Sequence, residues 1–156
     1  MPELYASQIE TLEELADVLE IRRAVFIDEQ DVPESEEIDR YDGDPTTAED
    51  AIHVLLHLGG AGGLPIATGR LLLDDPPGER AHIGRVAVLA QHRRAGAGRV
   101  VMRWLQSEAR RLGRPGITLS AQIHAIPFYE RLGYTARGDV FLDAAIEHRW
   151  MDLDFE

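Results

Sequence analysis

The residues best suited to chemistry lie where a buried strand runs through a glycine-containing turn into a long helix. Apolar residues at 83–88 predict the strand, the turn contains Gly96 and Gly98, and the helix is expected over residues 99–112. The first backbone N–H groups of a helix have no intrahelical acceptor, and the helix dipole adds positive potential there. Such a turn binds phosphate oxygens, and its small residues let a phosphate approach. The segment predicts a site for a phosphate-bearing cofactor.

Three classes of nucleotide-binding turn compete for this segment. A Walker loop needs a lysine after its last glycine, and the chain contains no lysine, which excludes that class. A dinucleotide-binding turn needs a third glycine where this chain has Val101, and an acidic residue at the end of the next strand, which is also missing. The third class has an arginine three residues before its first glycine, as Arg93 stands before Gly96.

The spacing Arg93-x-x-Gly96-x-Gly98 resembles the pyrophosphate-binding motif of the GNAT acetyltransferases. Residues 125–134 are similar to the family's second signature, in which an alanine-containing helix delivers a tyrosine, here Tyr129, beside the sulfur of the cofactor. The spacing between the two signatures also fits. The likeness covers nearly the whole chain, because further segments are similar to the ElaA-like branch of the family: residues 25–30, 37–39, 67–70, 83–85, 121–122 and 144–148.

This resemblance implies direct transfer of an acetyl group from acetyl-CoA to an amine, on the acyl-CoA N-acyltransferase fold. The backbone of residues 86–88 would pair with the pantetheine arm, and an amide there would polarise the thioester carbonyl. Gln122 stands where many members of the family have asparagine. The resemblance assigns the following residues to the cofactor: Val86, Ala87, Val88, Arg93, Arg94, Ala95, Gly96, Ala97, Gly98, Arg99, Gln122 and Tyr129.

Acetyl transfer to an amine needs one group that protonates the departing thiolate and one that accepts a proton from the amine. Tyr129 suits the first task, although without the motif it would be interpreted as a half-buried core aromatic. The proton acceptor stays open among Glu29, Glu37, Asp39, Glu147 and His148. Glu37 and His148 are taken with Tyr129 as the catalytic candidates, while a lone histidine in an alternating segment is more often structural.

The acceptor side is assigned by the same resemblance to six residues: Phe26, Glu29, Gln30, Asp39, His53 and Arg85. His53 and His57 have a metal-ligand spacing for a helix, but the alternation around them predicts a strand, so no metal site is expected. The acceptor is expected to be an amine of a small molecule or a protein. Two alternatives are a non-catalytic acyl-CoA-binding sensor and an acyltransferase for longer acyl groups.

The elements that must position these residues follow from periodicity and breaker residues. Thr11 and Glu14 form a capping box before a helix whose apolar positions 12, 15, 18, 19 and 25 are expected in the core. Residues 28–50 predict a long acidic loop with one short helical turn. The remaining elements are strands at 5–9, 52–58, 66–73, 82–89, 117–121, 134–137 and 146–153, and helices at 99–112 and 124–132.

This order predicts a single α+β domain over residues 1–156, with a mixed, mostly antiparallel sheet flanked by helices on both faces. The strands at 52–58, 66–73 and 82–89 are expected to form an antiparallel meander. No run of about 18 apolar residues suggests a membrane helix, and residues 1–8 lack the features of a signal peptide, so we expect a cytoplasmic protein without a membrane partner. The sequence leaves open whether the protein is a monomer or a homodimer.

Charge is unevenly distributed along the chain. The formal net charge of −12 argues against a nucleic-acid partner, and the lack of lysine fits either a salt-adapted host or a high-GC coding bias. The lack of cysteine excludes disulfides and thiolate nucleophiles. Residues 1–50 contain 17 acidic residues and 3 arginines, and this asymmetry predicts either a cationic acceptor or a merely solvating surface. Four arginines are expected on a solvated helix face: Arg103, Arg110, Arg111 and Arg114.

Overall fold

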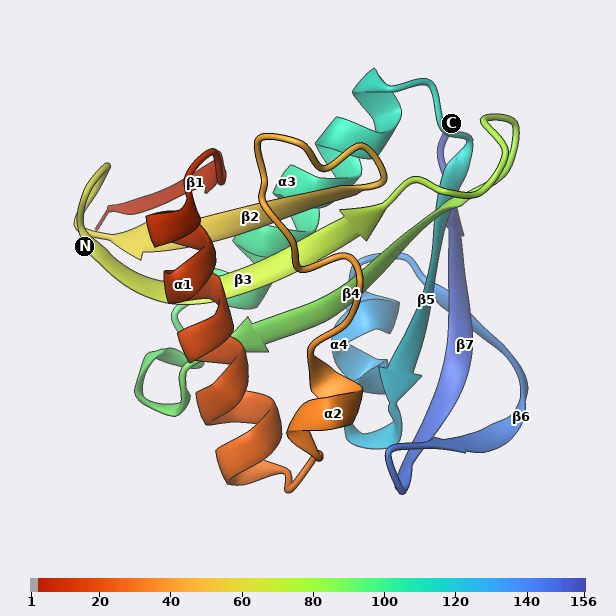
Figure 1. Cartoon of the computed structure of the whole chain (residues 1–156). Coiled ribbons are helices and arrows are strands. Elements are labelled where there is room, and N and C mark those ends of the chain that lie inside the picture. Colours follow the sequence, from red (N-terminus) through yellow and green to blue (C-terminus); the bar gives the residue numbers. More distant parts are fainter. Residues whose placement is uncertain (1–2) are drawn as a thin grey trace.

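A computed structural model describes residues 3–156 and shows a mixed sheet with helices on both faces (Figure 1). The described residues form seven strands in the order β1-β2-β3-β4-β5-β7-β6. All neighbouring strands are antiparallel except β4 and β5, which are parallel. The strands are β1 (Leu4–Gln8), β2 (Ala51–Leu58), β3 (Leu64–Leu72), β4 (Ala81–Val88), β5 (Gly116–Gln122), β6 (Thr135–Asp143) and β7 (Ile146–Asp154). The predicted α+β class and the β2-β3-β4 meander are confirmed.

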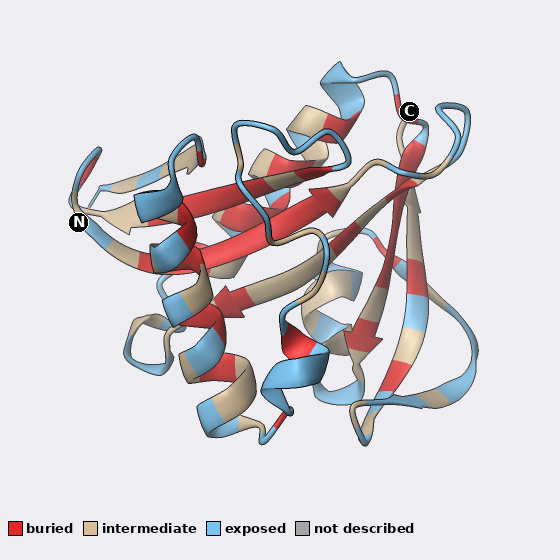
Figure 2. Ribbon diagram, viewed as in Figure 1, coloured by how far each residue is buried: buried red, intermediate tan, exposed pale blue. Residues whose placement is uncertain are grey.

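Two long helices cover opposite faces of the sheet. One core cluster joins α3 to the central strands, and a second joins α1 to the other face of β2 and β4. Figure 2 shows buried positions concentrated on those strands and on the inner side of α1. No helix among residues 3–156 is both long and apolar enough to cross a membrane. The helices are α1 (Leu12–Arg22), the π-helical segment η1 (Arg23–Glu29), α2 (Glu34–Glu37), α3 (Ala97–Arg111) and α4 (Ile126–Arg131), with short 3-10 turns at Ala90–His92 and Ile123–Ala125.

The first helix begins at the predicted capping box and ends in an unusual way. The Thr11 hydroxyl accepts a bond from the Glu14 amide at 3.1 Å, and the Glu14 carboxylate accepts one from the Glu10 amide at 2.9 Å. Leu12 was expected in the core but is 62% exposed, and the part of α1 that packs on the sheet begins at Leu15. After Arg22 the chain continues as seven residues of π-helix, a rare conformation that often occurs at functional sites.

Helix α3 lies close to the sheet because β3 has a glycine beneath it. A Cβ atom added at Gly69 would lie 2.8 Å from Val101 Cγ1 and 2.9 Å from Leu105 Cδ1. Those distances are too short for carbon atoms, so a larger residue would push α3 outward. Since the predicted phosphate-binding turn ends at the start of α3, Gly69 helps to fix the position of that turn from the middle of another strand.

The central strands β4 and β5 diverge, and this divergence opens the middle of the sheet (Figure 1). Among the described residues they pair only at Ala81 with Ile117 and at His82 with Thr118. Beyond these pairs, one edge of β4 faces a gap instead of a neighbouring strand. Its backbone N–H and C=O groups are therefore available to another extended chain or to a ligand.

Two other expectations need correction. Arg114 was expected on a solvated helix face, but it is buried, and its guanidinium donates to the carbonyl oxygens of Leu73, Asp75, Pro76 and Glu79. It follows the last turn of α3 and satisfies the carbonyls of the β3–β4 turn, so it has a structural role. The alternation in residues 52–58 also implies a less apolar second face, but both faces of β2 are buried, since Leu55 packs under α1 while Val54 and Leu56 pack under α3. The predicted short helical turn in the acidic loop is present as α2.

Candidate active site

A cavity of 570 Å³ occupies the gap between β4 and β5. Its volume lies in the usual range for small-molecule sites. It is bounded by η1, by β4 and the turn that follows it, by the end of β5, by α4 and by β7. Most residues assigned from the sequence line it: Phe26, Gln30, Glu37, Arg85, Val86, Ala87, Val88, Arg93, Arg94, Gly96, Ala97, Gly98, Arg99, Gln122, Tyr129 and His148. Four assigned residues lie outside its lining: Glu29, Asp39, His53 and Ala95.

The turn before α3 has the backbone conformation of an anion-binding site. Arg94 and Gly96 have φ values of 73° and 81°, in the left-handed region. Gly96 is also the N-cap of α3, so the amides that follow it are the first in the helix and point out of its end. A Cβ atom added at Gly96 would meet nothing within 4 Å, so the glycine is required for the backbone angle and not for packing.

Arg93 ties this turn to the end of η1. Its guanidinium contacts both carboxylate oxygens of Glu29, at 2.8 and 2.9 Å, and its Nε donates to the carbonyl oxygen of Val88 at 3.0 Å. Glu29 was assigned to the acceptor side, but the structure pairs it with the first residue of the phosphate motif. The physical reason is that η1 ends at Glu29, whose carboxylate lies beside the turn before α3 and meets the Arg93 guanidinium there.

Tyr129 comes from α4 and faces the same cavity. Its ring packs edge-to-face on Phe128 at 5.0 Å and on Tyr134 at 5.9 Å, which fixes its orientation. Burial raises the pKa of Tyr129 to about 12, since a phenolate would lose its hydration there. The phenol therefore carries its proton at neutral pH and can donate it.

His148 lies on β7 at the end of the cavity. It is paired in register with Gln122 of β5 and stacks on Phe141 at 5.8 Å. Its Nδ1 is 2.7 Å from the carbonyl oxygen of Ile146. A carbonyl oxygen only accepts hydrogen bonds, so Nδ1 carries the hydrogen and the neutral ring has its lone pair on Nε2. Within residues 3–156 the Nε2 atom has no hydrogen-bond partner, so in this tautomer it is the nitrogen that can accept a proton.

A side-chain bridge joins the two walls of the cavity. Gln122 Nε2 donates to Gln30 Oε1 at 2.8 Å, linking the end of β5 to the residue after η1. Phe26 lies one turn earlier on η1 and also lines the cavity. The amide of Gln122 is thus directed at Gln30. An asparagine has one carbon fewer and would be too short to make this contact from the same backbone position.

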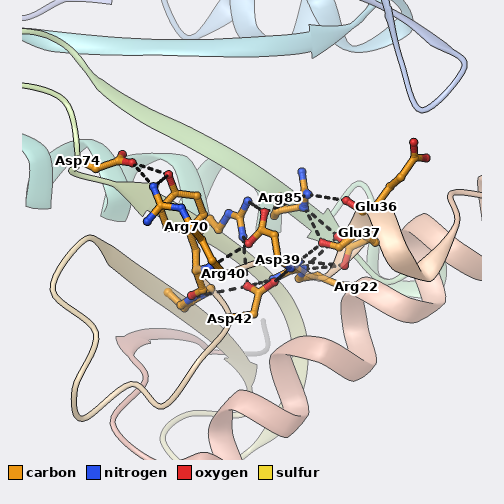
Figure 3. A network of polar contacts seen from close by, with 11 residues as sticks. Arg22, Glu36, Glu37, Asp39, Arg40, Asp42, Arg70, Asp74 and Arg85 are labelled. Carbon is orange, nitrogen blue, oxygen red and sulfur yellow. Dashed lines mark hydrogen bonds and ion pairs between the residues drawn. The ribbon is translucent and has the colours of Figure 1, made fainter.

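The acidic loop folds back onto the sheet through a cluster of ion pairs (Figure 3). Glu37 is 2% exposed, and Arg22 donates to both of its carboxylate oxygens at 2.9 to 3.2 Å. Arg85 Nε lies 3.0 Å from the same carboxylate. Two guanidinium groups occupy the Glu37 carboxylate, so its contacts are those of a structural ion pair.

The rest of the cluster joins the loop to β3. Arg70 contacts both carboxylate oxygens of Asp39 at 2.7 and 2.8 Å, and it also contacts Asp42 at 3.1 Å. Burial alone would raise the pKa of Asp39, but the hydrogen bonds and charge of Arg70 outweigh it and lower that pKa to about 2. Arg22 and Arg70 thus hold Asp42 from two sides, with an Arg22 contact of 2.6 Å.

His53 was assigned to the acceptor side, but it does not line the cavity. It is buried with its Nε2 3.0 Å from the carbonyl oxygen of Tyr41, beneath the acidic loop. Burial lowers the pKa of His53, since a charged imidazole would be poorly solvated there. Across residues 3–156, no group of three or more potential protein ligands is placed to hold a metal ion.

Arg22, Asp42 and Arg70, which position the loop, are absent from the site residues predicted from the sequence. Among residues 3–156, Arg22 is the largest fully buried side chain, although charged residues in helices are usually solvated. The sequence signal for burial of Arg22 is its position one residue after Ile21 and four after Val18, beside the apolar stripe of the helix. A charged residue at such a position needs an oppositely charged partner. That partner lies 15 residues away, in a loop without periodicity.

Comparison with known proteins gives a consistent result. Residues 15–134 match the acetyltransferase (GNAT) family. The chain is 36% identical over 143 residues to the uncharacterised N-acetyltransferase YjcF of Bacillus subtilis, covering 91% of this chain and 94% of that protein.

Two solved structures are similar over almost their full lengths. An acyl-CoA N-acyltransferase from Pseudomonas aeruginosa superposes with a TM-score of 0.75 at 31% identity, covering 97% of this chain and 99% of that one. Escherichia coli ElaA superposes with a TM-score of 0.77 at 27% identity and the same coverage. The family match over most of the chain and these full-length likenesses agree with the open β4–β5 gap: the chain belongs to the GNAT family of acetyltransferases.

Proposed function

We propose that this protein transfers an acetyl group from acetyl-CoA to a primary amine, and that the reaction takes place in the cavity between β4 and β5. The observation that carries the proposal is that one cavity joins the glycine turn before α3 to both Tyr129 and His148. Membership of the GNAT family supports an acyl-CoA donor. The name of the YjcF relative supports acetyl as the acyl group.

The cofactor would extend along the open edge of β4. Its pyrophosphate would bind the amides after Gly96, where the dipole of α3 favours negative charge. The pantetheine arm carries amide groups, which can pair with the backbone of Val86, Ala87 and Val88 in the place of a missing strand. A backbone N–H on this edge would then polarise the thioester carbonyl as negative charge develops on its oxygen.

Two side chains would move the protons. The amine nitrogen forms a bond to the carbonyl carbon, and the carbon–sulfur bond breaks. His148 Nε2 would accept the proton from the amine, directly or through water. Tyr129 would give its proton to the departing thiolate, which becomes basic only as it leaves. Glu37 would act as a positioning residue, because its carboxylate holds Arg22 and Arg85.

The proposal is tested by measuring release of free thiol from acetyl-CoA across a broad panel of amines, together with calorimetric binding of coenzyme A. We expect both binding and amine-dependent thiol release. Binding without turnover of any amine would indicate a non-catalytic acyl-CoA sensor. A preference for longer acyl-CoA would identify an acyltransferase of different donor specificity.

His148→Gln is the sharpest variant for the proton acceptor, since glutamine is polar but does not take up a proton near neutral pH. We expect turnover to fall by roughly a hundredfold, within the usual range for general-base catalysis. His124→Gln is the matched control, because His124 also lines the cavity but is exposed on the 3-10 turn before α4. Equal turnover in the wild type and His148→Gln would transfer the role to another group.

A further inference from the structure

Arg85 differs from its neighbour Arg22 in how its guanidinium is used. All three nitrogens of Arg22 donate hydrogen bonds to Glu37 or Asp42. Arg85 uses only Nε and Nη2, which contact Glu37, Asp39 and the carbonyl oxygen of Glu36. Its Nη1 has no hydrogen-bond partner among residues 3–156, and Figure 3 shows one terminal nitrogen of Arg85 directed away from the acidic residues.

Exposure separates the two arginines in the same way. The side chain of Arg22 is 1% exposed, whereas that of Arg85 is 27% exposed and lines the proposed acetyl-transfer cavity. In the described part of the chain, Arg85 therefore has one donor group, Nη1, that is unpaired and accessible to a ligand.

The charge on Arg85 is also less fully compensated. Burial lowers the pKa of Arg85, and repulsion from Arg70 lowers it further against the attraction of Glu37. The pKa of Arg22 is instead raised, since its bonds to Asp42 and Glu37 outweigh the effect of burial. An additional negative charge beside Arg85 would be stabilising, whereas Arg22 already has its full complement of anions.

The backbone holds this side chain in a constrained position. Arg85 has φ of 52°, which is uncommon for a residue with a long side chain. It lies in a bulge of β4, where the register passes from Gly84 opposite Arg70 to Ala87 opposite Thr68. Bulges re-direct side chains next to active sites. In this strained conformation the Arg85 side chain contacts the acidic loop and also lines the cavity.

The same contacts argue against a cationic acceptor, which is one of the two alternatives that the charge asymmetry predicts. Glu29, Glu37 and Asp39 are each paired with an arginine. In the buried cluster, three arginines face three carboxylates, so no excess negative charge is left to attract a cation. Glu36 and Asp143 do line the cavity, but both are exposed to solvent, where screening weakens their attraction.

We infer that Arg85 Nη1 binds a carboxylate of the acceptor, and that the acceptor is a small amine that carries a carboxylate, as amino acids do. This inference rests on the proposed acetyl transfer. The contact would be a charge-assisted hydrogen bond from Nη1, which is stronger than a bond between neutral groups. It would fix the acceptor on the side of the cavity formed by β4, with the amine left free to reach the thioester.

The test compares amino acids with their carboxamides, which keep the amine and the side chain but lose the carboxylate charge. Values of kcat/KM are measured by thiol release from acetyl-CoA for the wild type, Arg85→Gln, Arg70→Gln and Glu36→Gln. We expect the wild type to prefer the acid over the amide by roughly ten- to a hundredfold, the range of one charge-assisted bond. Arg85→Gln should reduce this ratio to about one.

Arg70→Gln is the matched control, because Arg70 belongs to the same cluster but lies outside the cavity lining. It should keep the acid preference, as should Glu36→Gln, even if either variant is less stable, since a ratio of two substrates does not depend on the folded fraction. An acid preference that survives in Arg85→Gln would overturn the inference. So would a wild-type preference for the amide, or for a diamine whose advantage disappears in Glu36→Gln.

Calorimetry separates failure of this inference from failure of the proposed function. Lack of coenzyme A binding would refute the proposed function itself. Normal cofactor binding and turnover with an acid-to-amide ratio near one would refute only the role of Arg85. If acetyl-CoA binds but no amine in the panel is acetylated, calorimetry instead compares the affinities of the acid and of the amide for the coenzyme A-bound protein. Equal affinities would overturn the inference.

Discussion

At one end of the cavity, the proposed phosphate-binding amides come from one continuous segment, residues 93–99, at the start of α3. At the other end, the charged groups come from α1, α2 and β4, where Arg22 and Arg85 meet Glu37 across 15 and 48 residues of sequence. The first end needs a backbone conformation that local sequence can specify. The second needs buried ion pairs, which form only when distant segments are already in place. A common cofactor would thus be bound by backbone, and a particular acceptor would be selected by side chains.

The largest effect is expected at the ion-paired end, from Arg22→Met, which keeps most of the volume of the side chain but leaves Glu37 with Arg85 alone and Asp42 with Arg70 alone as cation partners. We expect the free energy of unfolding to fall by about 3–5 kcal/mol, the usual effect of breaking a buried ion pair. Urea denaturation measures it. Arg23→Met is the control, because the ion pair of Arg23 with Glu34 is exposed and its loss should barely move the midpoint. Equal effects of the two changes would contradict the comparison.

Tyr129→Phe tests whether turnover can be lost while the phosphate-binding turn and the ion-paired cluster both stay intact. If Tyr129 is the general acid, turnover should fall by roughly ten- to a thousandfold while the affinity for coenzyme A stays nearly constant. Tyr134→Phe is a matched control, because the two rings are in contact but the Tyr134 hydroxyl donates to Gln106 at 2.8 Å. Wild-type turnover in Tyr129→Phe would leave Tyr129 as a packing residue.

Gly96→Val should weaken coenzyme A binding by about 1–3 kcal/mol, since a β-branched residue is strained at a positive φ and its side chain would obstruct a phosphate. Gly113→Val separates these two causes. Gly113 also has φ of 81° and open space around its Cβ position, but it lies after the other end of α3. We expect both variants to be less stable and only Gly96→Val to bind the cofactor more weakly by calorimetry. Unchanged affinity in Gly96→Val would remove the turn from the cofactor site.

The smallest expected effect is on stability in acid, and it concerns only the ion-paired end. The pKa of Asp39 is about 2 in the folded protein and is higher in the unfolded chain, so the unfolded state binds more protons as the pH falls. The stabilisation is fully present above about pH 4 and is lost toward pH 2. Since the carboxylate is partly exposed, solvent screening limits its loss to about 1 kcal/mol. Asp39→Asn should flatten the dependence of the urea midpoint on pH in this window, whereas an unchanged slope would assign the acid sensitivity to other groups.

Much of the fold could be predicted because the signals were local. The meander, the capping box at Thr11 and Glu14, and the helix that ends before Gly113 each depend on periodicity or on a residue with one favoured conformation. The first helix was predicted less well. Leu12 has the apolar character of a core residue but is exposed, and local sequence contains no rule for a π-helical continuation over Arg23–Glu29.

The sequence by itself determined the glycine turn, since the left-handed conformation of Gly96 and the free amides of a helix start are properties of one short segment. Tertiary structure alone decided that Glu29 pairs with Arg93, that His53 lies under the acidic loop, and that Arg85 keeps one nitrogen free. The physical reason is that a charged side chain has no fixed role until burial determines which opposite charge is near. In the unfolded chain every one of these groups is solvated by water, and only the folded protein replaces that water with a particular partner.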